Sequence, residues 1–155
     1  FTDFIMPRIT ALGNAGIIWI ILAAVLLCIP RYRRCGAVLA AGLLAGLVFG
    51  NLLIKPLIHR PRPCWLYEVP LITKIPSDYS FPSGHTYSSF TAAFLLLRYN
   101  KRWGIAALAL AVLIAFSRMY LYAHFPTDVL GGIVLAVAVS TAVTAVDKRI
   151  ETKEI

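Results

Sequence analysis

Long runs of hydrophobic positions dominate the chain, and short groups of polar residues separate them. A helix needs about 20 apolar residues to cross the roughly 30 Å hydrocarbon core of a bilayer. The pattern therefore predicts an all-α integral membrane protein, a helical bundle with about five transmembrane helices. Residues 1–10 are expected to form the remnant of an interfacial helix. The predicted spans cover residues 11–29, 36–54, about 83–97, 103–122 and 127–146.

Composition supports the same class. Of the 155 residues, 59% are hydrophobic and 14% are charged, and the mean hydropathy is +0.78. A soluble domain is about 45–50% apolar and about 25% charged, so a disordered chain or an ordinary soluble enzyme is excluded. The length predicts a single domain over residues 1–155. Three cysteines, without a CxxC pair or a metal-binding spacing, argue against a disulfide framework.

The net charge is +8, and the charged residues lie between the apolar runs. Membrane topology or an anionic ligand therefore explains the excess of cations better than binding to nucleic acid does. When the loops are assigned alternately to two sides, nine cations, Arg34 and Arg98 among them, fall on one side and six on the other. The nine lie in short loops, as is typical of the cytoplasmic side. We therefore expect the loop 55–81 and the N-terminus to face outward from the plasma membrane, and the C-terminus to face inward.

Three polar clusters, at residues 55–63, 81–86 and 117–128, lie at the outer ends of the predicted helices. At 1.5 Å per residue, Ser83 and Arg118 lie roughly 22–24 Å above the inner boundary of the membrane. The clusters therefore share one level, slightly recessed into the outer leaflet. Ionisable groups at that depth usually face a polar cavity.

The cations of these clusters indicate a phosphate site. Lys55, Arg62 and Arg118 have no matching number of nearby carboxylates, and guanidinium groups suit phosphate oxygens. Residues 82–85 predict the start of a helix. Ser83 can cap this helix, and Gly84 lets an anion approach its free N–H groups. Together these residues would form a phosphate cradle.

Two histidines complete the predicted chemistry. His124 stands four residues before Asp128, and a carboxylate on one ring nitrogen leaves the other as a nucleophile or base. His85 is suited to protonate a departing oxygen, and the cations would stabilise the charge of the transition state. The pattern predicts phosphoryl transfer through a phosphohistidine, followed by hydrolysis. No metal or cofactor is expected, because two histidines with few carboxylates make a poor metal site.

The spacing of these residues resembles the three-part signature of the type 2 phosphatidic acid phosphatase superfamily. The first part, Lys, six residues, then Arg-Pro, matches residues 55–63. The second part, Pro-Ser-Gly-His, matches residues 82–85. The third part, Ser-Arg, five residues, His, three residues, Asp, matches residues 117–128. The resemblance covers about residues 10–146.

This resemblance implies a helical membrane phosphatase whose site lies at the extracytoplasmic face. It implies His124 as the nucleophile, Asp128 as its partner and His85 as the acid for the leaving group. It also implies metal independence and inhibition by vanadate. The residues implied to hold phosphate are Lys55, Arg62, Ser83, Gly84 and Arg118.

Some features go beyond the signature. Many membrane members have six spanning helices with the first motif after the third, whereas two predicted spans precede Lys55, so one helix is missing from this sequence or absent. Arg60 lies outside the fixed positions of the first motif, and we expect it to meet lipid head groups rather than a second phosphate. The loop 64–80 mixes aromatic and charged residues and is expected to form a lid at the lipid–water interface. Small residues at 40–46 and 131–132 predict close helix packing.

The preferred function is hydrolysis of a polyprenyl diphosphate, such as undecaprenyl diphosphate, to the monophosphate. A phosphatase for phosphatidic acid or phosphatidylglycerophosphate would use the same residues, so the motifs do not discriminate. A vanadate-dependent haloperoxidase shares the cradle but is soluble and larger. A non-catalytic lipid-binding or transport protein needs neither an acid nor a nucleophile. The expected partners are the phosphorylated lipid and membrane lipids, without nucleic acid, and the sequence does not indicate an oligomeric state.

Overall fold

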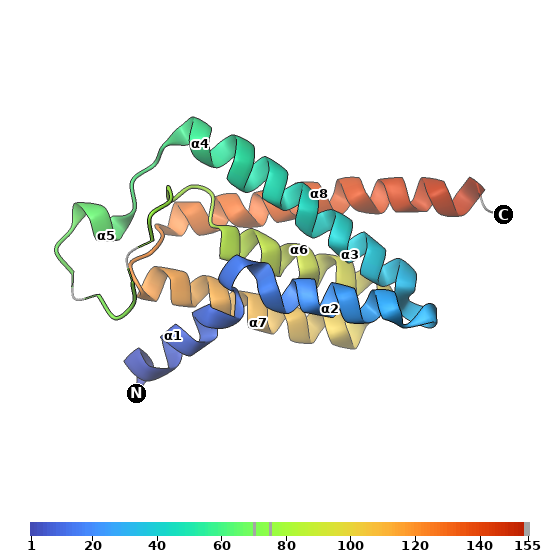
Figure 1. Ribbon diagram of the computed structural model, residues 1–155, viewed down its shortest axis with the longest axis horizontal. Helices are drawn as coiled ribbons and strands as arrows, with labels where there is room; N and C mark the ends of the chain where they lie inside the picture. Colours follow the sequence, from blue (N-terminus) through green and yellow to red (C-terminus); the bar gives the residue numbers. More distant parts are fainter. Residues whose placement is uncertain (70, 75, 154–155) are drawn as a thin grey trace.

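The computed structural model describes residues 1–69, 71–74 and 76–153, and every regular element in this part of the chain is helical (Figure 1). The predicted all-α fold is thus confirmed. In chain order the elements, with η marking 3-10 or π geometry, are α1 (Thr2–Leu12), η1 (Asn14–Gly16), α2 (Ile17–Cys28), η2 (Pro30–Tyr32), α3 (Arg33–Gly46), η3 (Leu47–Ile54), α4 (Lys55–Ile58), α5 (Pro63–Leu66), α6 (Gly84–Tyr99), α7 (Lys101–Tyr120) and α8 (Pro126–Lys153).

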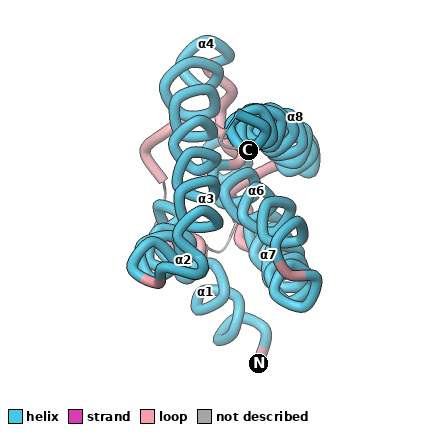
Figure 2. The backbone as a smooth tube through the Cα atoms, turned by 90° about the vertical axis from the view of Figure 1, so that its right-hand side faces the viewer, coloured by secondary structure: helices cyan, strands magenta, loops and turns pink. Residues whose placement is uncertain are grey.

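Within the described residues, four helical stretches are long and apolar enough to cross a membrane. The third predicted span, at about residues 83–97, forms α6, which has 16 residues and therefore measures about 24 Å. Most of α6 is buried, and it packs against α3, α7 and α8 at the centre of the bundle (Figure 2). The protein is thus a membrane helical bundle built around α6. The four stretches are Thr2–Cys28, Pro30–Leu66, Lys101–Tyr120 and Pro126–Thr152.

The first predicted span is divided by a turn. Residues 1–10 fall largely in α1, which packs against α7, and α2 begins only at Ile17. Between the two helices, Ala15 and Gly16 have positive φ angles of 52° and 68°. This turn reaches the first part of α6, so the N-terminal segment lies beside the end of the bundle that carries the three polar clusters.

Local chemistry explains where the helices begin. Ser83 caps α6, and the Asn100 side chain accepts from two backbone N–H groups at the start of α7, as is typical of N-cap residues. Pro126 opens α8, where its missing N–H is not needed. The Asp128 carboxylate accepts from the Phe125 backbone N–H at 2.8 Å. The polar residues that begin α6 and α8 therefore belong to the three clusters.

The predicted close packing at small residues is confirmed. A Cβ added to Gly42, Gly46 or Gly131 would lie 2.6, 2.5 or 2.3 Å from the side chain that faces it. The facing side chains are Leu95, Tyr87 and Phe81 respectively. Only glycine allows α3 and α8 to approach these side chains so closely.

The end of the bundle remote from the clusters is held by ion pairs. Asp147 on α8 lies 2.8 Å from Arg34 and 2.7 Å from Arg98. Glu151, one turn later, approaches the same two arginines at 3.3 and 3.7 Å. Two of the cations counted for topology therefore also connect α3, α6 and α8.

Candidate active site

The three polar clusters meet at one end of the bundle. They occupy the segments around α4 and α5, before α6, and between α7 and α8 (Figure 1). Backbone hydrogen bonds join the three segments. Ser80 N donates to Arg60 O at 2.8 Å, Ser83 N donates to Asp128 O at 3.1 Å, and Cys64 N donates to Tyr122 O at 3.1 Å. These bonds bring together side chains that lie up to 73 residues apart in the sequence.

A cavity of about 970 Å³ opens at this end of the bundle. Its polar part contains four cations, one carboxylate and two imidazoles, with a helix N-terminus beside them. This combination suits a multivalent anion. Six of the eight predicted site residues line it, namely Lys55, Arg62, Gly84, His85, Arg118 and His124.

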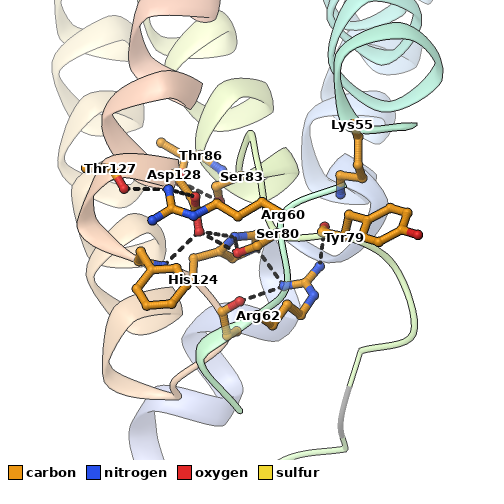
Figure 3. Close-up of polar contacts among 12 residues, drawn as sticks. Lys55, Arg60, Arg62, Tyr79, Ser80, Ser83, Thr86, His124, Thr127 and Asp128 are labelled. Carbon is orange, nitrogen blue, oxygen red and sulfur yellow. Dashed lines mark hydrogen bonds and ion pairs between the residues drawn. The ribbon is translucent and has the colours of Figure 1, made fainter. Parts of the chain in front are cut away.

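The other two predicted residues lie behind the cavity wall. Ser83 is fully buried, and its Oγ accepts from the Thr86 backbone N–H at 3.4 Å and from the Thr86 hydroxyl at 2.9 Å. The Ser83 side chain thus caps α6, as the sequence predicted. Asp128 is also fully buried and lies next to the His124 ring (Figure 3).

His124 is buried between a cation and a carboxylate. Its Nε2 lies 3.0 Å from Arg62 Nη1, and its Nδ1 faces Asp128 Oδ2 across 3.6 Å. Burial lowers the pKa of the imidazole to about 4. Asp128 opposes this shift, while Arg62 and Arg118 strengthen it. The imidazole is therefore neutral at pH 7, with the Nε2 lone pair on the side of the cavity.

Ser80 connects the imidazole to the carboxylate. Its hydroxyl donates to Asp128 Oδ2 and lies 3.4 Å from His124 Nδ1 (Figure 3). Sequence reasoning missed this fully buried serine, although it stands only three residues before Ser83. A polar residue so close to a helix cap and a histidine was the available signal.

Arg60 also belongs to this group, a contact that the sequence did not predict. Its Nη1 lies 2.7 Å from Asp128 Oδ1 and 2.6 Å from Thr127 Oγ1. The guanidinium also stacks over the Phe125 ring, 4.4 Å from its centroid. A buried carboxylate needs a partner, and the backbone bond from Ser80 N to Arg60 O places Arg60 beside Asp128.

Asp78, in the predicted lid, occupies the cationic part of the cavity. Its carboxylate lies 2.5 Å from Lys55 Nζ and 2.7 Å from Arg62 Nη2. Burial alone would raise the pKa of this carboxyl, but Lys55 and Arg62 outweigh burial and hold the pKa at about 2. An anionic oxygen pair therefore already lies where the cations of the site converge.

Arg62 itself is tightly held. Its guanidinium donates to the backbone oxygens of Asp78 and Ala123, each at 2.7 Å, and to Tyr79 O at 3.3 Å. These hydrogen bonds fix the orientation of the guanidinium plane, with Nη1 beside His124. A guanidinium fixed in this way can bind a phosphate without losing much side-chain entropy.

Two contacts come from the N-terminal segment. Arg118 Nη1 donates to Thr10 Oγ1 at 2.8 Å, and His85 Nε2 lies 2.9 Å from Asn14 Oδ1. Arg118 Nε is buried and has no partner within the described part of the chain, so the guanidinium keeps a donor for a ligand. In that same part of the chain, no three His, Cys, Asp or Glu side chains are grouped to hold a metal ion.

The cavity continues as an apolar groove between α2 and α3. Its walls there carry only aliphatic side chains. The groove starts beside the cations and runs along both helices toward the remote end of the bundle. The residues that line it are Ile20, Ala23, Ala24, Leu27, Ala40, Leu43, Leu44 and Leu47.

The sequence and the fold are similar to those of known membrane phosphatases. Residues 35–151 match the profile of the PAP2 superfamily. An undecaprenyl-diphosphatase of Sulfolobus acidocaldarius is 34% identical over 74% of this chain and 56% of its own length. Phosphatidylglycerophosphatase B of Bacillus subtilis is 38% identical over 71% of this chain and 60% of its own length. The chain thus spans somewhat more than half the length of these two relatives.

A solved structure shares the arrangement of the helices. The crystal structure of LpxE from Aquifex aeolicus superposes with a TM-score of 0.80 and 27% sequence identity, and the match covers 92% of this chain and 85% of that one. The likeness extends beyond residues 35–151, because so large a share of the chain is matched.

Proposed function

The chain belongs to the PAP2 superfamily, and on this premise we propose that it is a metal-independent membrane lipid phosphatase. One observation carries the proposal: the cavity joins a cationic end that contains His124 to an apolar groove between α2 and α3. The cationic end suits a phosphate group, and the groove suits a hydrocarbon chain because its walls are aliphatic. A molecule with both parts is a phosphorylated lipid.

The substrate we propose is a polyprenyl diphosphate, such as undecaprenyl diphosphate, which is cleaved to the monophosphate. The name of the Sulfolobus relative supports this choice. The three cations Lys55, Arg62 and Arg118 match the high negative charge of a diphosphate. The name of the Bacillus relative supports the alternative, a phosphatidylglycerophosphate or phosphatidic acid phosphatase with the same site.

In the first step, His124 Nε2 attacks the terminal phosphorus. The bond from phosphorus to the leaving oxygen breaks, and His85 donates a proton to that oxygen. The His124 imidazole becomes positively charged as its new N–P bond forms, and Asp128 stabilises that charge through Nδ1. In the free protein, Arg62 Nη1 donates to His124 and Arg62 Nη2 donates to Asp78. When the substrate binds, its phosphate oxygens accept these two hydrogen bonds instead.

In the second step, water attacks the phosphorus of the phosphohistidine. His85, now neutral, accepts a proton from the water as the N–P bond breaks. Inorganic phosphate leaves, and both histidines return to their starting states. Lys55, Arg62, Arg118 and the N–H groups at Gly84 stabilise the charge on the phosphoryl oxygens in both steps.

We propose further that the site faces outward at the extracytoplasmic surface of the plasma membrane. The cation count supports this orientation, because nine cations lie toward the remote end of the bundle and six lie toward the site. A lipid carrier that is released on the outer face would then reach the groove directly.

Phosphate release by the purified protein in detergent with EDTA tests the proposed reaction. A polyprenyl diphosphate, phosphatidic acid and phosphatidylglycerophosphate are compared side by side. We expect EDTA-resistant release that is fastest with the diphosphate. Preference for a glycerolipid would favour the alternative substrate, and loss of activity with EDTA would contradict the metal-independent reaction.

Histidine variants test the proposed roles. His124→Ala should abolish turnover while a phosphate analogue such as vanadate still binds, and an alkaline quench of the wild-type enzyme should preserve a phosphorylated histidine. His85→Ala should retain a slow reaction. His59→Ala is the matched control, since His59 is exposed and does not line the cavity. An active His124→Ala protein would reject the proposed nucleophile.

A further inference from the structure

The turn between α1 and α2 lies directly against the ring of His85. A Cβ added to Gly13 would lie 2.8 Å from His85 Cδ2 and 3.0 Å from Ile114 Cγ2. Any residue larger than glycine would therefore displace the imidazole or move the turn away from it. The backbone at Gly13 thus forms one wall of the space that the ring occupies.

Asn14, the next residue, makes a polar contact with the same ring. Its Oδ1 lies 2.9 Å from His85 Nε2. An amide oxygen only accepts hydrogen bonds, so the proton resides on Nε2. The contact fixes the direction of the ring and leaves Nδ1 as the nitrogen that is free to exchange a proton.

A second residue of this segment contacts a second cavity residue. Thr10 stands four residues before Asn14, and its hydroxyl accepts from Arg118 Nη1 at 2.8 Å. Thr10 and Arg118 are both buried. The two contacts come from a part of the chain that precedes the family match at residue 35.

We infer that Asn14 is a positioning residue for His85, and this inference rests on the proposed role of His85 as the acid. Asn14 holds the Nε2 proton throughout the reaction. The bound phosphate offsets the cations around His85 and favours a ring protonated from solvent. This ring donates its Nδ1 proton to the leaving oxygen as the P–O bond breaks, and Nδ1 later takes a proton from the attacking water. Asn14 thus serves His85 as Asp128 serves His124, with a neutral acceptor in place of a carboxylate.

The leaving group provides the first test. Asn14→Leu keeps a similar volume but removes the acceptor, and we compare its kcat/KM for an alkyl phosphate and for an activated aryl phosphate. A positioned acid contributes about 10²–10⁴-fold, so loss of its orientation should lower kcat/KM for the alkyl phosphate about tenfold. The aryl phosphate, whose leaving group needs little protonation, should change less than about twofold, which also shows that the variant is folded.

The matched control is Leu12→Ala, which truncates an exposed side chain in the same segment and should leave both rates unchanged. Equal losses for the two substrates in Asn14→Leu would overturn the inference, because a general defect in folding or phosphate binding does not depend on the leaving group.

A double-mutant cycle separates this inference from the proposed function. In a His85→Ala background, Asn14→Leu should cause no further loss, and independent losses would overturn the positioning role. If His85→Ala alone leaves kcat/KM for the alkyl phosphate intact, His85 is not the acid, and the role of Asn14 in acid catalysis is rejected too. The assignment of His124 as the nucleophile would not be affected by that result.

The tautomer gives a readout that does not depend on activity. In detergent-solubilised protein with ¹⁵N-labelled histidine, the His85 resonances, assigned by their absence from His85→Ala, should report protonated Nε2 in the wild type. Asn14→Leu should shift the population toward protonated Nδ1. An unchanged spectrum would overturn the inference, because Asn14 would then not determine the state of the ring.

Discussion

At the scale of single residues, the ionisation of His124 sets the pH range of the proposed reaction. A nucleophilic imidazole must be neutral, and burial lowers the pKa of His124 to about 4 from an ordinary value of 6.5. Because the pKa is lowered, the reactive form persists on the acid side down to that value. We expect the acid limb of kcat/KM, measured from about pH 3.5 to 8, to be centred near pH 4, whereas any alkaline limb would report the acid His85. An acid limb centred near 6.5 would contradict the buried, neutral nucleophile.

We expect Arg60 to act through Asp128 and not through the substrate, because its guanidinium bonds to the carboxylate and to Thr127. Arg60→Leu leaves a buried carboxylate without its ion-pair partner, so we expect kcat to fall about tenfold or more with little change in KM. Arg149→Leu, at the exposed remote end of α8, is the control. A rise in KM with an unchanged kcat would instead place Arg60 at the lipid head group.

Asp78 pairs with Lys55 and Arg62, and we expect it to compete with the substrate for them. With a pKa of about 2 the carboxyl is ionised at every working pH, and a phosphate has to displace it. We expect Asp78→Asn to lower the inhibition constants of inorganic phosphate and vanadate several-fold. Glu68→Gln, an exposed carboxylate in the same loop, should change neither constant. Weaker inhibition in Asp78→Asn would show that Asp78 positions the cations instead.

At the scale of elements, the site depends on how closely α8 approaches the segment that begins α6. Gly131 lies against Phe81, where an added Cβ would be 2.3 Å from the ring. Phe81 directly follows Ser80, which bonds to Asp128. Glycine at this position therefore links helix packing to the geometry of the His124–Asp128 pair.

Gly131→Ala should force Phe81 or α8 to move, and overpacking of this kind destabilises by about 1–3 kcal/mol. We expect a lower Tm in detergent together with a reduced kcat, because Ser80 moves with its neighbour. Val134→Ala, one turn along α8 and 69% exposed, should change both far less. A Gly131→Ala protein with a wild-type Tm would show that the approach of α8 is not tight.

At the scale of the whole molecule, the two ends of the bundle differ in chemistry. One end carries the cavity, and the other carries Asp147 with its two arginines. The cysteines are divided between the two ends: Cys64 lies in α5 beside the site, while Cys28 ends α2 and Cys35 lies near the start of α3 at the remote end. The thiols of Cys64 and Cys28 therefore report the orientation without an engineered label.

With an impermeant maleimide and intact cells, Cys64 should react in the proposed orientation, while exposed Cys28 should react only after permeabilisation. Buried Cys35 serves as the internal control, since it should stay unreacted in both conditions. Reaction of Cys28 in intact cells, with Cys64 protected, would reverse the orientation and the lipid pool that the site can reach.

The helices and most of the cavity residues were predictable from the sequence. A helix that crosses a bilayer needs a long apolar run, so the hydropathy of the sequence is enough to locate the spanning helices. Polar residues are rare in such a chain, so Lys55, Arg62, His85, Arg118 and His124 stood out against an apolar background. Because each lies at or beside a helix end that falls on the same side of the membrane when the spans alternate, the sequence also predicted that they would meet.

The partners of these residues were decided by tertiary structure. Arg60 pairs with Asp128, and Asp78 pairs with Lys55. Ser80 donates to Asp128 beside His124, and Asn14 contacts His85. Each pairing joins segments far apart in the chain, and a polar side chain takes whichever partner the packed backbone brings within hydrogen-bond reach. Sequence spacing determines which chemical groups a bundle of this kind presents, whereas the approach of one segment to another determines which groups bind to each other.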